Sequence, residues 1–164
     1  MKQERAERLY ALVAERGFRL AYALTGSQQT AEDITHDAFI KLYSRLGRIS
    51  DIDRLTSYIY RTVISVVRDQ HRKNSARRTR EARVAISVST PSIDVDIETS
   101  DEVWTALLQL PVRQRAAIYL RYYEDLPEAT AAAYLDCSVS SMKSLTHRAL
   151  RSMRSVLESS GGEQ

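Results

Sequence analysis

One face of the helix predicted over residues 54–72 gathers side chains that are well suited to binding a nucleic acid. Steps of three or four residues place an aromatic ring, a hydroxyl and three guanidinium groups together: Tyr58, Arg61, Ser65, Arg68 and Arg72. Guanidinium groups hold phosphates and an aromatic ring stacks on bases, so this pattern indicates a nucleic-acid interface. The alternative interpretation is the ordinary solvated face of an amphipathic helix.

A second candidate surface belongs to two helices predicted near the C-terminus, over residues 126–135 and from 139 to about 157. A tight turn at Asp136-Cys137 joins them, Ser138 is a suitable N-cap, and alanines in the first permit a close crossing, as in a helix-turn-helix. Polar groups on the second helix would suit phosphates and base edges, and a helical hairpin without a ligand is the alternative. We expect this helix to bury Val139, Met142, Ala149 and Met153 and to expose Ser140, Ser141, Lys143, Ser144, His147, Arg148 and Arg151.

Patterns for catalysis or metal binding are missing from the sequence. His36, His71 and His147 are scattered without the spacing of a metal site, and there is no glycine-rich phosphate loop or nucleophile motif. The single cysteine, Cys137, excludes an internal disulfide and is interpreted as a small packing residue. The sequence therefore predicts a protein that is not an enzyme and holds no metal or cofactor.

The elements that position these side chains are all predicted to be helices. The chain has 164 residues with 43% hydrophobic composition, and Gly and Pro total only eight, which disfavours a sandwich or barrel. Further helices are predicted over residues 4–24, 103–110 and 111–124. Another is predicted to begin at a capping box at Thr30 and to carry an apolar stripe of Ile34, Ala38, Leu42 and Leu46. With no signal peptide and no apolar run long enough for a membrane span, the chain is expected to be cytoplasmic, without membrane insertion.

Charge divides the chain into two units. Residues 71–83 carry six basic groups against Glu81, whereas residues 84–102 carry five acids and no basic group. Adjacent blocks of opposite sign are typical of linkers and interaction segments. We therefore predict an all-α protein with a helical domain over residues 1–73, a flexible basic-then-acidic linker over 74–100, a helix-turn-helix domain over 101–158 and a disordered tail over 159–164.

Several stretches together resemble one known family. Residues 31–39 (AEDITHDAF) are similar to the core-binding helix of bacterial sigma-70 family factors. Residues 108–115 (LQLPVRQR), 120–126 (LRYYEDL) and 137–144 (CSVSSMKS), with Arg148-Ala149, resemble the promoter-reading C-terminal domain. With only these two domains, the chain resembles the extracytoplasmic-function (ECF) branch. The sequences of its C-terminal motifs resemble those of an actinobacterial subset of that branch. The resemblance covers nearly the whole chain, in the right order.

The resemblance implies a dissociable initiation subunit of RNA polymerase with three contact surfaces. It places core polymerase, through the β′ clamp helices and the β flap, and promoter DNA among the partners, with an anti-sigma factor as a further candidate and a monomer when free. Carboxylates beside an exposed aromatic would make a mixed polar and apolar docking surface on the core. The implied core-binding residues are Asp33, His36, Asp37 and Phe39. The minus-ten residues are Ser50, Asp51 and the face from Tyr58 to Arg72, and the minus-thirty-five residues are the exposed face of the last helix.

This sequence departs from the family pattern at particular positions. Asp136 stands in the turn where Gly is usual, and it tolerates a left-handed backbone better than most residues. Leu145, at a position often polar, could join the core face instead of touching DNA. The competing interpretation is a stand-alone helix-turn-helix regulator, which explains the C-terminal domain but gives no purpose to the acidic docking helix or the long tether.

Overall fold

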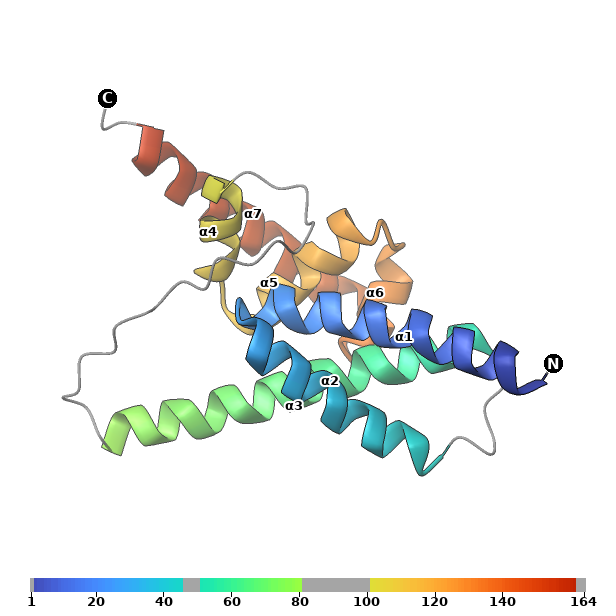
Figure 1. Cartoon of the computed structure of the whole chain (residues 1–164). Helices are drawn as coiled ribbons and strands as arrows, with labels where there is room; N and C mark the ends of the chain where they lie inside the picture. The colour runs from blue at the N-terminus through green and yellow to red at the C-terminus, as the bar shows by residue number, and fades with distance from the viewer. Residues whose placement is uncertain (1, 46–50, 81–100, 162–164) are drawn as a thin grey trace.

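The computed structural model describes residues 2–45, 51–80 and 101–161, and every element in these ranges is a helix (Figure 1). The all-α prediction is confirmed. The N-terminal unit consists of α1 (Lys2–Thr25), α2 (Gln28–Tyr43) and α3 (Ile52–Arg80). The C-terminal unit consists of α4 (Asp101–Leu108), α5 (Val112–Ile118), the π-helix η2 (Tyr119–Tyr123), α6 (Glu128–Tyr134) and α7 (Val139–Gly161). None of the described helices has the length and apolarity needed to cross a membrane.

The N-terminal unit is built around α1, which packs against both α2 and α3. The predicted stripe on α2 is confirmed, because Ile34, Ala38 and Leu42 are fully buried, while Leu46 lies outside the described residues. Gly17 lets α1 approach α3 closely, since a Cβ at this position would lie 3.0 Å from Cγ1 of Ile59. Burial of this apolar face holds the exposed faces of α2 and α3 in place.

The start of α2 differs from the prediction. Ser27, not Thr30, is the N-cap: its backbone is extended, and its hydroxyl accepts a hydrogen bond from the Thr30 backbone N–H at 3.3 Å. Ser27 and Thr30 both have side chains suitable for an N-cap. Gly26 follows the end of α1 with φ of +69°, and this leaves Ser27 directly before the first residue of α2, Gln28. The capping box therefore lies three residues into α2.

The third helix is longer than predicted, and the predicted linker boundary at residue 74 is corrected. We expected the helix to end near Arg72, but α3 continues to Arg80 and extends past the other two helices of its unit (Figure 1). No Gly or Pro interrupts residues 52–80, and adding a residue to an existing helix costs little, so polar composition alone does not end it. The remainder of the predicted linker, residues 81–100, lies outside the described residues.

The helix-turn-helix is formed by α6 and α7. Asp136, in the turn between them, has φ of +53°, as its position predicted. The Ser138 hydroxyl accepts the Ser141 backbone N–H at 3.1 Å, which confirms Ser138 as the cap of α7. Met142, Ala149 and Met153 are buried as expected, but Val139 is 41% exposed because it lies in the first turn, beyond the end of the core.

The C-terminal end of the chain also differs from the prediction. Residues 159–161, assigned to a disordered tail, continue α7, and the hydroxyls of Ser159 and Ser160 donate to carbonyls one turn earlier. Such bonds from a serine hydroxyl to the carbonyl four residues earlier are common inside helices. Residues 162–164 lie outside the described residues.

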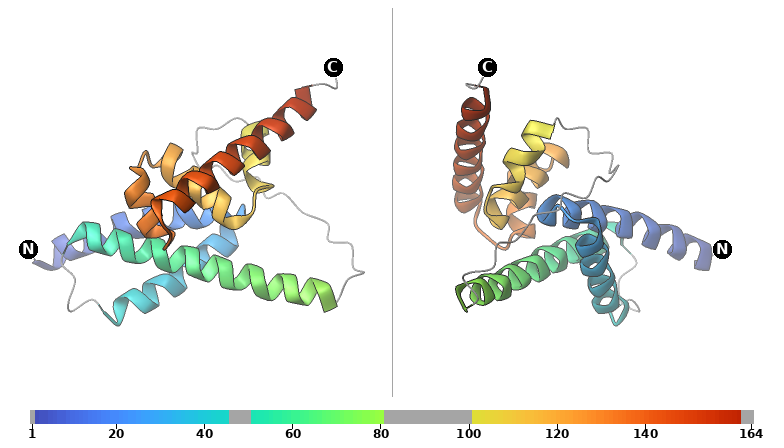
Figure 2. Two further views of the ribbon diagram at one scale, coloured as in Figure 1. Left: turned by 180° about the vertical axis from the view of Figure 1, so that it is seen from behind. Right: turned by 60° about the vertical axis from the view of Figure 1, so that its left-hand side comes forward.

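The two units pack against each other. α5 contacts both α1 and α3, and α6 contacts α3. Figure 2 shows the C-terminal helices lying against α1 and α3 in both views. One cluster of buried side chains runs through both units, so residues far apart in sequence, such as Leu20, Ile59 and Leu120, belong to the same core.

Candidate functional site

The outer surface of α2 carries the residues predicted to bind core polymerase. Asp33, His36 and Asp37 are exposed, and Phe39 is half-buried with its ring 6.4 Å from that of Tyr10 in an edge-to-face arrangement. All four lie on one helix, but they divide between two neighbouring faces because of the 3.6-residue helical repeat.

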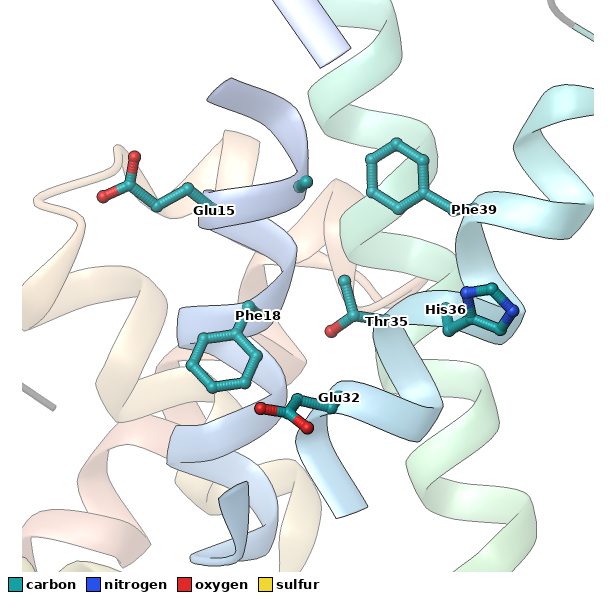
Figure 3. Close-up of a pocket in the computed structure, with 7 residues that line it drawn as sticks. Glu15, Phe18, Glu32, Thr35, His36 and Phe39 are labelled. Atoms are coloured by element: carbon teal, nitrogen blue, oxygen red, sulfur yellow. The ribbon is translucent and has the colours of Figure 1, made fainter. Parts of the chain in front are cut away.

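One of these faces borders a groove between α1 and α2. Its volume is about 420 Å³, and Figure 3 shows that the side chains that line it come from α1 and from α2. His36 and Phe39 line it from α2, together with Glu32 and Thr35, while Phe18 lines it from α1. The groove is largely apolar with charged groups at its edge, which is the composition of a protein docking site.

The other face forms a continuous exposed stripe along α2. Asp33 and Asp37 are followed at helical spacing by Ile40 and Tyr43, which are 58% and 76% exposed. Sequence reasoning missed these last two residues, although their spacing from the aspartates could have indicated them. Two large apolar side chains exposed beside carboxylates extend the docking surface by about one and a half turns.

The predicted minus-ten face lies together on α3. Arg61, Ser65 and Arg72 are exposed, whereas Tyr58 and Arg68 are partly buried. The Tyr58 hydroxyl points to the backbone carbonyl of Lys41 at 3.5 Å, and the Arg45 guanidinium lies 5.5 Å from the centre of its ring. This cation–π contact orients the aromatic ring toward the junction of α2 and α3.

A cavity of about 360 Å³ opens beside Tyr58 and Arg61. Asp53, Arg54 and Ser57 complete its lining. Ser57, in the first turns of α3, was missed by the sequence reasoning although it lies four residues before Arg61, so helical spacing again carried the missing signal.

Two predicted minus-ten residues precede α3. Asp51 is exposed, and its carboxylate accepts the Asp53 backbone N–H at 3.0 Å, which positions the start of the helix. Ser50 lies outside the described residues. The structure therefore gives Asp51 a local role in helix initiation that is compatible with an exposed surface position.

The predicted minus-thirty-five face is an exposed surface of α7. Lys143 also pairs with Glu128 of α6 at 3.8 Å, and Ser138 donates to the Ser141 hydroxyl at 3.0 Å. Leu145 is half-buried against the core, which confirms it as a packing residue. Exposure is observed for Ser140, Ser141, Lys143, Ser144, His147, Arg148 and Arg151.

These surfaces offer cations, hydroxyls and aromatic rings for binding. Within the ranges that the structure describes, no three His, Cys, Asp or Glu residues gather in a way that could hold a metal ion. What the arrangement can do is present two separate basic surfaces, on α3 and α7, and one acidic and apolar surface, on α2.

Comparisons with known proteins match two regions of the chain. Residues 9–77 match the family model for sigma-70 region 2, and residues 100–153 match the one for sigma-70 region 4. The chain is 30% identical over 146 residues to the RNA polymerase sigma-E factor of Streptomyces avermitilis, covering 86% of this chain and 78% of that protein. It is 25% identical over 153 residues to the ECF RNA polymerase sigma factor SigW of Bacillus subtilis, covering 85% and 82%.

A solved structure has a similar fold across both units. The sigma factor RpoE of Bartonella quintana, crystallised in complex with the anti-sigma factor NepR, superposes with a TM-score of 0.76. The match covers 96% of this chain and 98% of that one at 21% sequence identity.

Proposed function

The chain belongs to the ECF branch of the sigma-70 family and is an RNA polymerase sigma factor, and we propose that it joins core polymerase through α2 and reads a promoter with α3 and α7. The observation that carries this assignment of surfaces is their separation. The acidic and apolar stripe of α2 lies on one element, and the two basic faces lie on α3 and α7. A stand-alone regulator would use the face on α7 alone, so it is not favoured.

We assign core docking to α2. Carboxylates of Asp33 and Asp37 supply hydrogen-bond acceptors, and Ile40 and Tyr43 supply apolar area that is exposed in the free chain. On the family resemblance, the partner surface is the pair of clamp helices of β′, with the β flap receiving the C-terminal unit. His36 and Phe39, at the edge of the groove, would bind the side of the same hairpin.

We assign minus-ten recognition to the cavity at the start of α3. A volume of about 360 Å³ beside an aromatic ring accommodates an extruded base, and Arg54 and Arg61 at its lining can hold the flanking phosphates. Extrusion costs a few kcal/mol, and stacking on an aromatic ring contributes about 1–3 kcal/mol toward that cost. Ser50 and Asp51 would lie at the entrance, and Ser65, Arg68 and Arg72 would follow the separated strand.

We assign minus-thirty-five recognition to the exposed face of α7. The N-terminal residues of a recognition helix reach base edges, so Ser140, Lys143 and Ser144 are the candidates for base contacts. Arg148 and Arg151, one to two turns later, are placed to hold phosphates. Partners and setting follow from this function: promoter DNA and core polymerase in the cytoplasm, without catalysis by the chain itself, and with an anti-sigma factor as in the RpoE relative.

Co-purification with core polymerase, followed by run-off transcription from the gene's own upstream region, tests the proposal. The double variant Asp33→Asn, Asp37→Asn removes two charges without changing side-chain size, and we expect about tenfold weaker core binding, or about 1.4 kcal/mol. Glu7→Gln, an exposed acid on α1, is the matched control and should bind like the wild type. A chain that ignores core polymerase yet shifts promoter DNA by itself would be a stand-alone regulator.

A further inference from the structure

An ion pair joins the two helices of the helix-turn-helix. The ammonium group of Lys143, in the second turn of α7, lies 3.8 Å from a carboxylate oxygen of Glu128, in the first turn of α6. Across the ranges that the structure describes, neither side chain takes part in another ion pair. A negative charge from α6 therefore accompanies the lysine of the recognition helix.

Stability gives this pair little purpose. The Lys143 side chain is 64% exposed and that of Glu128 is 36% exposed, and ion pairs this open to water add little to the stability of a fold. A carboxylate in a first helical turn also favours the start of that helix, which is the simplest alternative role for Glu128. Beyond these effects, the pair presents a cation and an anion side by side at the protein surface.

The two charges lie at the end of α7 that the proposed function turns toward the major groove. Ser140 and Ser144, both exposed, lie close to Lys143 in the first turns of α7, where a recognition helix reaches base edges. A carboxylate at this position repels the phosphates on either side of the groove and so lowers affinity for DNA in general. It contributes to binding only where it accepts a hydrogen bond from the amino group of a base.

The pair matches the hydrogen-bonding pattern of one G·C base pair. In the major groove, guanine presents two acceptors, N7 and O6, and the paired cytosine presents an amino donor at N4. The ammonium of Lys143 can donate to the guanine while the carboxylate of Glu128 accepts from the cytosine. An A·T pair in the same orientation would set the adenine amino group against the ammonium and the thymine O4 against the carboxylate. The order of the two charges therefore favours G·C and rejects A·T.

We propose that Glu128 and Lys143 together read one G·C base pair of the minus-thirty-five element, with the guanine on the Lys143 side. The inference rests on the proposed function and deepens it, because it adds a specificity-determining residue from α6 to the recognition surface of α7. Lys143 supplies attraction to DNA. Glu128 supplies selectivity, because it pairs with the cytosine at the matched site and repels DNA elsewhere, and specificity is the difference between the two affinities.

Selection from a pool of randomised duplexes, bound by the complex of the full chain with core polymerase, tests the pair. The wild type should enrich a G·C pair whose replacement by A·T weakens binding about tenfold. Glu128→Ala should abolish that preference and strengthen binding to unselected duplexes roughly two- to fivefold, since a repulsive charge is removed. Glu128→Gln, whose amide both donates and accepts, should tolerate A·T at the same position. Lys143→Ala should lose the same preference and weaken binding to every duplex.

Glu158→Gln is the matched control. It removes an exposed acid from α7 about four turns beyond Lys143, and the complex should enrich the same sequences as the wild type. Thermal unfolding of each variant separates recognition from a structural role. If Glu128 served only the start of α6, Glu128→Ala would lower thermal stability and leave the G·C preference intact.

The outcomes distinguish this inference from the proposed function. A G·C preference retained by both Glu128 variants would overturn the inference and leave minus-thirty-five recognition by α7 standing. Effects of Glu128→Ala and Lys143→Ala at different base pairs would also overturn it, because the two side chains would then not read one pair. A wild-type complex that enriches no sequence would remove the proposed function, and the inference with it.

Discussion

Gly26 provides the sharpest test of how the two units fit together. It ends α1 with φ of +69°, and its backbone N–H donates to the carbonyl of Tyr22 at 2.7 Å. A Cβ at this position would lie 3.0 Å from Cδ2 and 3.2 Å from Cδ1 of Leu108, a residue of the other unit. Gly26→Ala therefore adds two costs: a left-handed alanine inside the first unit and a steric contact with the other unit.

The two costs can be estimated separately. A left-handed conformation costs a non-glycine residue roughly 1–2 kcal/mol. Pushing the Leu108 side chain away from its preferred rotamer adds about 0.5–1.5 kcal/mol. We expect Gly26→Ala to reduce the free energy of unfolding by about 1.5–3.5 kcal/mol in the wild-type background. In a Leu108→Ala background only the backbone cost should remain, so the coupling energy should be about 0.5–1.5 kcal/mol.

Urea denaturation of the four proteins in this double-mutant cycle gives the coupling energy. Trp104 is the only tryptophan and stacks on Tyr22, so its fluorescence reports the contact between the units, while circular dichroism reports the helices. Gly161→Ala is the control, because no atom lies within 4 Å of the added Cβ, and it should leave the midpoint unchanged. An equal penalty for Gly26→Ala in both backgrounds would refute the contact between the units.

Three further outcomes follow from local contacts. Ser138→Ala removes the N-cap of α7 and should lower the free energy of unfolding of the C-terminal unit by about 1 kcal/mol in urea, whereas Ser140→Ala, outside the cap, should not. Tyr60→Phe keeps the ring but removes a buried hydroxyl that has no hydrogen-bond partner in the described structure, so thermal unfolding should show equal or greater stability, by up to about 1 kcal/mol. Burial, and secondarily the carboxylate of Glu124, raise the pKa of both Tyr60 and Tyr119, so the folded state favours their neutral forms. Stability should therefore be constant below about pH 10 and fall above it by about 1.4 kcal/mol per pH unit for each tyrosine, and Tyr60→Phe should reduce that slope. A flat profile between pH 9 and 11 would contradict burial of these phenols.

Features fixed by local chemistry could be predicted from the sequence. The stripe on α2 follows from helical periodicity, and the turn before α7 follows from Asp136 and the Ser138 cap. Both depend on residues within one or two turns of each other, so no knowledge of the tertiary structure was needed. The same local reasoning selected the face of α3 and the exposed polar residues of α7.

Features fixed by long-range packing, or by the lack of a stop signal, could not be predicted. The end of α3 at Arg80 has no marker, because its last turns are polar and carry no core-facing stripe. Arg115 resembles a surface residue of a short helix, yet burial lowers its pKa to about 10, and its partners come from three other segments. Ile40 lies at helical spacing from the aspartates, which places it on their face of α2, but its 58% exposure follows only from how α2 packs on the core.

The contact between the two units and the proposed DNA-binding surfaces use different side chains, so they should respond differently to salt. The contact between the two units combines the stacked rings of Tyr22 and Trp104 with Arg115, whose guanidinium donates to backbone carbonyls of both units, and such contacts change little with salt. The proposed DNA contacts use exposed cations, whose affinity falls steeply with salt because counterions are released on binding. The proposed docking stripe of α2 overlaps neither set, so Asp33→Asn, Asp37→Asn should weaken core binding without changing the salt dependence of DNA binding or the stability of the contact between the units.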